Sequence, residues 1–218
     1  MNEPISRRPI RARDTRWAGA IARWLQRIGL KPNQISLLSI LFGALAGASL
    51  LAVGNGDTPS WKCGCFLLAA VGIQLRLLCN LFDGMVAVEG GIRTKSGELF
   101  NELPDRFSDA FIFVGAGYAF PDPAWLRELA WAAAVLAVMA AYVRTLGASM
   151  GAGQQFLGPM AKQHRMAAMT LAAVANGVAV FFTSSSMILV AMLGLIVVGT
   201  LITIWRRCRS IICVVEKA

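Results

Sequence analysis

Long apolar stretches separated by short polar segments make up most of this chain of 218 residues. Six of these stretches are long enough, at roughly 20 residues each, to cross the hydrocarbon core of a bilayer as helices. We therefore predict an all-α, polytopic membrane protein with about six transmembrane helices. The predicted spans are residues 34–54, 60–88, 98–120, 125–147, 166–183 and 187–205.

A different pattern precedes the first span. In residues 15–30, Trp17, Trp24 and other apolar side chains recur at helical spacing with arginines between them, which is typical of an amphipathic helix lying at the membrane interface. Pro32 then breaks the chain, and we expect Asn33 to cap the following helix. The predicted organisation is a basic cytoplasmic segment with the interfacial helix over 1–32, a six-helix transmembrane domain over 33–206 and a basic cytoplasmic tail over 207–218.

Composition agrees with this pattern. Only 15% of the residues are charged, against roughly 25% in a soluble domain, and the mean hydropathy is +0.60. The net charge of +9 could indicate nucleic-acid binding, but eight of the 21 basic residues precede the first span. A basic segment beside a span is typical of a cytoplasmic flank on anionic lipid, so we expect membrane lipid and no nucleic acid as partner. The five cysteines are odd in number and irregularly spaced, which argues against a disulfide framework.

The distribution of Lys and Arg predicts the orientation. Basic residues occur in the N-terminal segment, in the 89–97 and 148–165 loops and in the C-terminal tail, whereas the alternate turns hold only Lys62 and Arg127. Six spans with both termini cytoplasmic satisfy the positive-inside rule at every loop. We expect the protein in the bacterial inner (cytoplasmic) membrane.

Acidic residues gather in one part of the chain. Six of the twelve lie between positions 83 and 109, and several of these fall inside the second and third spans: Asp83, Glu89, Glu98, Glu102, Asp105 and Asp109. A carboxylate within a span costs at least about 2.5–3.5 kcal/mol on insertion scales, so it indicates a functional site by default. Hydrogen bonding between helices could explain one such residue but explains six poorly.

The spacing of these residues suggests metal chemistry. Asn80 and Asp83 share one face of the second span, and Asn101, Asp105 and Asp109 follow at four-residue steps along the third. The two spans are joined by a short loop, so the two faces can meet. Clustered carboxylate and amide oxygens suit hard divalent cations such as Mg²⁺ or Mn²⁺.

Arg76 also lies inside the second span and needs a partner. It precedes Asp83 by seven residues, about 10 Å deeper in the membrane. Asp109 lies at a similar depth on the third span. We predict a structural ion pair between Arg76 and Asp109, in which case reversing both charges preserves folding better than reversing one.

The run of residues from Asn80 to Asp105 resembles the motif of a known family. The CDP-alcohol phosphotransferase family carries D-x2-D-G-x2-A-R-x8-G-x3-D-x3-D across its second and third spans, and the matching run here is NLFDGMVAVEGGIRTKSGELFNELPD. The motif covers about 26 residues, whereas the six-span architecture covers nearly the whole chain. The matching positions are Asp83, Gly84, Ala87, Gly97 and Asp105, and the Lys31-Pro32-Asn33 entry also resembles the family's approach to its first span.

The chain departs from the family pattern at three positions. The family's first and third Asp are Asn80 and Asn101 here, and its Arg is Val88. By the resemblance, Asp105 is the catalytic base, and the metal ligands are Asp83, Asp105, Asn80 and Asn101. Glu102 beside Asn101 could restore missing negative charge, as Glu98 could. Arg93 or Lys95 could replace the missing cation near the nucleotide.

The resemblance implies the reaction. A CDP-linked donor, usually CDP-diacylglycerol, lies with its pyrophosphate on Mg²⁺ or Mn²⁺, with Gly84, Ala87 and Gly97 around the nucleotide. Asp105 takes the proton of an acceptor alcohol, which attacks the β-phosphorus, and CMP leaves. Many family members are dimers, so a homodimer is a further expectation.

Basic residues around the fourth and fifth spans have two interpretations. Arg144, Lys162 and Arg165 occupy positions where some family members bind the acceptor's phosphate, although they also fit a positive-inside flank. His164 is the only histidine, and its isolation argues against a catalytic role.

Two other hypotheses remain open. One is a family-like protein without catalysis that binds lipid or nucleotide, because Asn80 and Asn101 replace two aspartates. The other is a transporter with an acidic coupling site, against which the lack of an inverted repeat argues.

Overall fold

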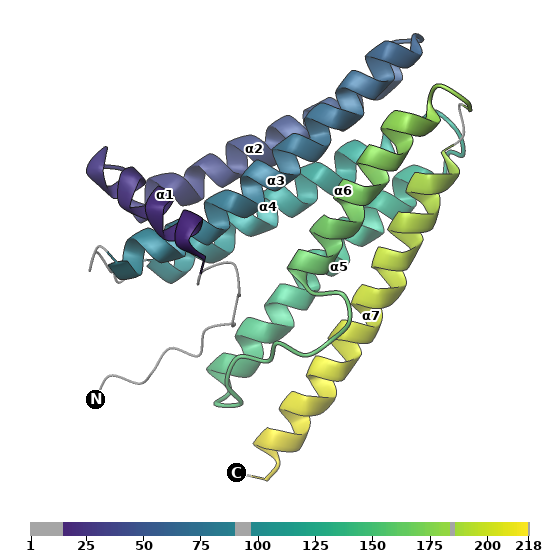
Figure 1. Ribbon diagram of the computed structural model, residues 1–218. Coiled ribbons are helices and arrows are strands. Elements are labelled where there is room, and N and C mark those ends of the chain that lie inside the picture. Colours follow the sequence, from purple (N-terminus) through teal and green to yellow (C-terminus); the bar gives the residue numbers. More distant parts are fainter. Residues whose placement is uncertain (1–14, 90–96, 184–185, 218) are drawn as a thin grey trace.

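The computed structural model describes residues 15–89, 97–183 and 186–217, and the regular elements within them are all helical. In chain order they are α1 (Arg16–Arg27), α2 (Pro32–Ala52), the short 3₁₀ helix η2 (Val53–Asn55), α3 (Pro59–Glu89), α4 (Gly97–Gly117), α5 (Leu126–Ser149), α6 (Lys162–Ala179) and α7 (Met187–Val215). Figure 1 shows α2 to α7 as one bundle, with α1 lying across one of its ends.

The six long helices pack as a closed ring. Helix α2 packs against α3, α3 against α6, α6 against α7, α7 against α5, α5 against α4, and α4 returns to α2. The acid-bearing helices α3 and α4 touch each other much less than each touches α2. The ion pairs between α3 and α4 run from the long Arg76 side chain to Asp105 and Asp109, and α2 packs against both helices.

The interior of the ring is mainly small and aliphatic. One buried cluster draws residues from all six long helices, including Leu50, Phe66, Ile112, Met169 and Leu193. Outward-facing positions are also apolar, as at Leu41, Leu171 and Leu195, each more than half exposed. A helix that is apolar on both faces is typical of a lipid environment rather than of water.

Four helices are long and apolar enough to cross a membrane: α2 with η2, α3, α5 and α7. Helices α4 and α6 are not among these four, in keeping with the charged and polar residues that both carry. The prediction of an all-α integral membrane protein is thus supported, whereas the number of six spans stays a prediction.

Two local details differ from the sequence predictions. Helix α7 continues to Val215, through the predicted boundary between residues 206 and 207. The N-cap of α2 is Lys31, whose N–H donates to Gln34 Oε1 at 2.9 Å, so the expected cap at Asn33 is wrong. Pro32 explains the shift, because its fixed φ and missing N–H suit the first helical position.

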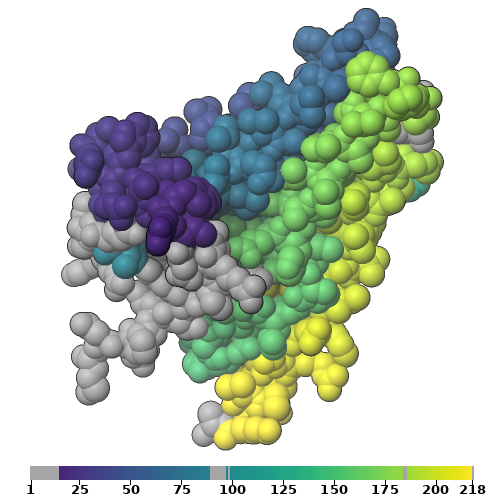
Figure 2. All heavy atoms as spheres, viewed as in Figure 1, coloured from purple at the N-terminus to yellow at the C-terminus, as the bar shows by residue number. Residues whose placement is uncertain are grey.

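Helix α1 is amphipathic, as the sequence predicts, and its place at a membrane interface stays a prediction. Ala18 and Ala22 are buried against α3, near Phe82 and Val86, whereas Trp24 on the opposite face is 58% exposed. Figure 2 shows α1 on the outer surface at one end of the molecule. That end is also where Asp83 lies on α3.

Small residues let α2 approach its neighbours closely. Ser36, Ser39, Gly43 and Gly47 form one buried stripe along α2. A side chain at Gly47 would collide with the backbone carbonyl of Phe111 on α4. Such stripes of small residues are typical of helix packing in membranes, where backbones approach closely.

Candidate functional site

Two carboxylates on α4 and three cations form a continuous ion-pair network inside the ring. Asp105 pairs with Lys162 through Oδ2 and with Arg76 through Oδ1, the latter at 3.3 Å from Nη2. Asp109 pairs with the same Arg76 Nη2 and, at 2.9 Å, with Arg165 Nη2. The order is therefore Lys162–Asp105–Arg76–Asp109–Arg165, with α3, α4 and α6 each contributing. The structure contains the predicted Arg76–Asp109 contact, but as one link in this longer network.

The network explains how these charges tolerate burial. Arg76 has no exposed surface, and Asp109 and Arg165 are almost as deeply buried. Arg165 Nη1 also donates to the Met160 carbonyl at 3.1 Å. Charges out of water are stable only when they are paired and hydrogen-bonded, and each member here meets that condition at least once.

Asp83 lies beside this network on α3. It is buried, and its Oδ2 accepts a hydrogen bond of 2.8 Å from Ser36 Oγ on α2. Asp105 and Lys162 are both close enough to interact with it electrostatically. Within the described residues Asp83 makes no ion pair, so its charge is the least compensated in the cluster. Sequence reasoning did not find Ser36, although the small-residue stripe on α2 was a usable signal.

The two asparagines of the motif differ in placement. The Nδ2 atom of Asn80 is buried and has no hydrogen-bond partner in the described structure. Turning the amide over would present its oxygen instead, because the two orientations are nearly indistinguishable. Asn101 is exposed near the start of α4. Asn80 thus stays a candidate ligand beside Asp83, whereas nothing in the structure brings Asn101 to that point.

Glu102 pairs with two arginines and does not point toward the other carboxylates. One of its oxygens pairs with Arg106 on the next turn of α4, and the other pairs with Arg144 on α5. Arg144 also donates to Gln154 at 3.2 Å and lies over the ring of Phe156. Glu102 therefore neutralises and orients Arg144, which is a different role from the predicted metal ligand.

The predicted acceptor residues separate into two groups. Arg144 and Lys162 are partly exposed, with 15% and 26% of their side chains accessible, and lie at the rim of the site. Arg165 is 3% exposed and belongs to the buried network, so it is not placed to meet an acceptor. His164 is exposed and lies outside the network.

The remaining motif positions lie at the same end of the bundle. Gly84 and Ala87 are in the last turns of α3, and Gly97 is the first residue of α4. Val88 is 41% exposed. Arg93 and Lys95, the suggested substitutes for the family's arginine, lie outside the described residues, as do the side chains of Glu89 and Glu98.

Oxygens near Asp83 are candidate ligands for one hard divalent cation. Asp83 is an uncompensated buried carboxylate, Asn80 lies one turn away on the same helix, and Asp105 is nearby. Mg²⁺ is commonly bound by one or two carboxylates together with substrate phosphates. The described residues contain no group of three or more His, Cys, Asp or Glu side chains that could hold a metal, so a substrate would have to complete the coordination.

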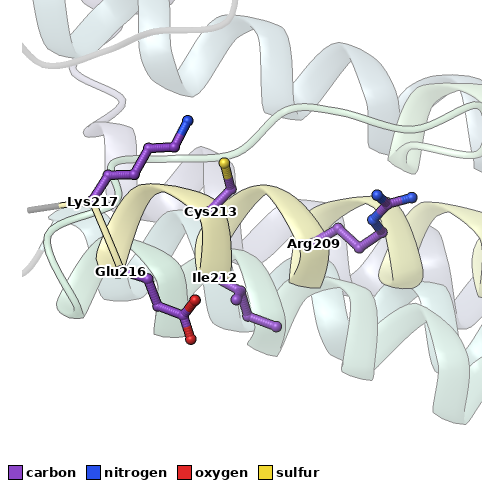
Figure 3. Close-up of a pocket in the computed structure, with 5 residues that line it drawn as sticks. All are labelled: Arg209, Ile212, Cys213, Glu216 and Lys217. Atoms are coloured by element: carbon purple, nitrogen blue, oxygen red, sulfur yellow. The ribbon is translucent and has the colours of Figure 1, made fainter.

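A separate surface hollow occurs at the C-terminal end of α7. Figure 3 shows its lining residues, Arg209, Ile212, Cys213, Glu216 and Lys217. All five are exposed and belong to one helix end, and they are not members of the network around Asp105. The ionisable side chains that could carry chemistry are therefore those of the buried network.

No protein-family model matches the chain. It is 28% identical over 91 residues to inner membrane protein YnbA of Escherichia coli K12, a match that covers 42% of this chain and 42% of that relative. The chain thus aligns with less than half of the length of that curated relative.

Solved structures share the fold. Phosphatidylinositol phosphate synthase of Mycobacterium tuberculosis with CDP-DAG bound has a TM-score of 0.72 at 24% identity, over 90% of this chain and 94% of that one. The same synthase in complex with manganese and citrate has a TM-score of 0.73 at 23% identity, over 89% and 88%. At this level of identity, these likenesses show a common fold over nearly the whole chain.

Proposed function

We propose that the chain is a divergent member of the CDP-alcohol phosphotransferase family and makes a phospholipid. In this proposal it transfers a phosphatidyl group from a CDP-diacylglycerol-type donor to an acceptor alcohol and releases CMP. The observation that carries the proposal concerns Asp83 and Asp105. They stand at the family's motif spacing on two different helices, both are buried, and they are close enough to interact electrostatically. The shared fold with a synthase crystallised with CDP-DAG supports the donor class.

Binding of the donor follows from the charges at the end of the bundle. Lys162 and Arg144 are partly exposed cations at the rim of the site, beside the buried carboxylates. These two cations would attract the negatively charged diphosphate of the donor. The donor's acyl chains would lie along the apolar outer faces of the helices. Residues at Gly84 and Ala87 are small, which leaves the nucleotide room near the end of α3.

Asp105 is the residue that would accept the proton. The acceptor oxygen forms a bond to the β-phosphorus, the bond from that phosphorus to CMP breaks, and the hydroxyl proton passes to the Asp105 carboxylate. A bound Mg²⁺ or Mn²⁺ supplies charge stabilisation for the departing phosphate. Arg76, fixed between Asp105 and Asp109, holds the Asp105 carboxylate in place through Oδ1.

Oδ2 of Asp105 is the oxygen left for the acceptor. It is now paired with Lys162, whose side chain is the more exposed of the two partners. The acceptor hydroxyl would displace the ammonium from Oδ2, and the ammonium could then turn toward phosphate oxygens. Arg144, oriented by Glu102, is the second cation available to an acceptor phosphate.

The test is CMP release from CDP-diacylglycerol by purified protein in proteoliposomes with Mg²⁺ or Mn²⁺ and a panel of acceptor alcohols. We expect metal-dependent release that Asp105→Asn abolishes. The matched control is Asp57→Asn, the same change in the turn between η2 and α3. No release with any acceptor would contradict the proposal.

A second candidate is a non-catalytic relative that binds lipid or nucleotide. The specific observation in its favour is that Asn80 and Asn101 replace aspartates while Lys162 already pairs with Asp105. Nucleotide binding without CMP release would support this candidate over the transferase.

A further inference from the structure

We propose that Lys162 is a built-in cation of the site, which takes the place of a divalent ion beside Asp105 and limits the site to one such ion. The inference deepens the proposed function and rests on it only for the presence of a divalent ion. Its geometric basis is the direct ion pair between Lys162 Nζ and Asp105 Oδ2.

The position of Lys162 in the fold makes this contact specific. Lys162 is the first residue of α6, and the backbone there is extended at Ala161 before the helix begins. One turn later Arg165 anchors α6 to Asp109 on α4. The start of α6 is thus fixed beside α4. Lys162 there reaches Asp105, which lies one helical turn before Asp109 on α4. Since Asp105 is buried, this ammonium is not an interchangeable surface charge.

The charge balance supports the same conclusion. The described site contains four carboxylates, namely Asp83, Glu102, Asp105 and Asp109. It contains five cations in ion pairs with the last three of these: Arg76, Arg106, Arg144, Lys162 and Arg165. The protein therefore already supplies one more positive than negative charge. Each divalent ion adds two positive charges, and like charges that share one buried carboxylate repel strongly.

Among the four carboxylates of the described site, only one remains open to an added cation. Both oxygens of Asp105, of Asp109 and of Glu102 accept from a cationic side chain. Asp83 accepts from the neutral Ser36 hydroxyl and has no ion pair within the described part of the chain. One divalent ion at Asp83 and Asn80 is therefore compatible with this arrangement, whereas a second ion at Asp105 would have to expel Lys162.

The direct test counts bound Mn²⁺ in the purified full-length protein in nanodiscs, by electron paramagnetic resonance titration with CDP-diacylglycerol present. Wild type should bind one Mn²⁺ per chain. Lys162→Met removes the competing charge and keeps most of the side-chain length. It should therefore tighten Mn²⁺ binding by about tenfold or more, or admit a second ion.

Two variants control for changes that are merely structural. Lys162→Arg keeps the charge and should bind Mn²⁺ as wild type does, in number and affinity. Lys62→Met makes the same chemical change at the opposite end of α3, about 31 Å along the helix from Asp83, and should also match wild type.

The inference fails if wild type binds two Mn²⁺ or none, or if Lys162→Met neither binds Mn²⁺ more tightly than wild type nor admits a second ion. Where Lys162→Met does not fold, the wild-type stoichiometry and the Lys162→Gln variant decide the question. Because the measurement is binding, its outcome is separate from that of the proposed transferase. One Mn²⁺ without CMP release supports the role of Lys162 and contradicts catalysis, and CMP release with two Mn²⁺ does the reverse.

Discussion

Exchanging the charges of Arg76 and Asp109 tests whether the buried ion pairs act as a network. For an isolated pair, the double variant Arg76→Asp with Asp109→Arg would keep the attraction and recover most of the stability lost in either single variant. In the structure, each residue has a second partner. The exchanged Asp would face Asp105, and the exchanged Arg would face Arg165.

The expected magnitude follows from these contacts. Either single reversal removes buried attractions and leaves like charges together, and breaking one buried pair costs about 3–5 kcal/mol. The double variant restores one pair but creates a like-charge contact at each end. The shorter Asp side chain on α3 also cannot span the distance that Arg76 covers. We expect the double variant to be at least as unstable as the single variants, by about 3–5 kcal/mol or more relative to wild type.

Unfolding in mixed micelles with increasing SDS, followed by tryptophan fluorescence, gives the unfolding free energies. Lys217→Asp reverses an exposed charge at the end of α7 and should change stability by no more than about 0.5 kcal/mol. Recovery of the exchanged double variant to within about 1 kcal/mol of wild type would show an isolated pair and refute the network.

Two further predictions concern packing. Gly47→Leu should destabilise the protein by about 1–3 kcal/mol or more in the same unfolding assay, because the added side chain meets the backbone of α4. Gly64→Ala, where the added carbon has open space, should cause no loss; equal losses in both variants would contradict the close approach of α2 and α4. Arg207→Met should speed proteolysis of the 150–161 segment, because buried Arg207 donates to the Leu157 carbonyl at 3.0 Å and also to a carbonyl on α5. Arg209→Met, which changes an exposed side chain on the same helix, should leave the cleavage rate unchanged, and unchanged rates in both variants would remove Arg207 as the anchor of this segment.

Sequence periodicity was sufficient to predict the helices and the end of the bundle that carries the site. The predicted spans overlap the helices α2 through α7, of which α2, α3, α5 and α7 are long and apolar enough to cross a membrane. The concentration of acids between positions 83 and 109 located the site, since carboxylates in spans are costly and rarely structural. The pairing of Arg76 with Asp109 followed from depth alone, because both residues lie in predicted spans.

Relations between helices distant in the sequence were harder to predict. Lys162 and Arg165 looked like part of a loop flank, and nothing in the local pattern places the start of α6 beside α4. Loop residues and flanking charges carry no periodic signal, so their partners depend on the packing order of the ring. The same limit applies to Glu102. Its sequence neighbours suggest a role at the metal site, whereas in the structure it pairs with arginines on α4 and α5.

The continuation of α7 beyond residue 206 has a similar cause. The basic run at Arg206, Arg207 and Arg209 predicts the end of a span, but it does not end the helix, which continues to Val215. A span can end while the helix continues, because the backbone remains satisfied and Arg207 finds buried carbonyl partners. Hydropathy therefore predicts the end of the apolar stretch of a sequence, and this need not be the end of the helix.

The most direct test of the central claim is the initial rate of CMP release from CDP-diacylglycerol by wild type, Asp83→Asn, Asp105→Asn and the control Asp57→Asn. We expect a metal-dependent rate in wild type and Asp57→Asn. The rate should fall roughly 10²–10⁴-fold in Asp105→Asn and by a comparable factor in Asp83→Asn, because the first variant loses the proton acceptor and the second loses the open carboxylate. Equal rates in all four proteins, or no CMP from any of them, would contradict that claim.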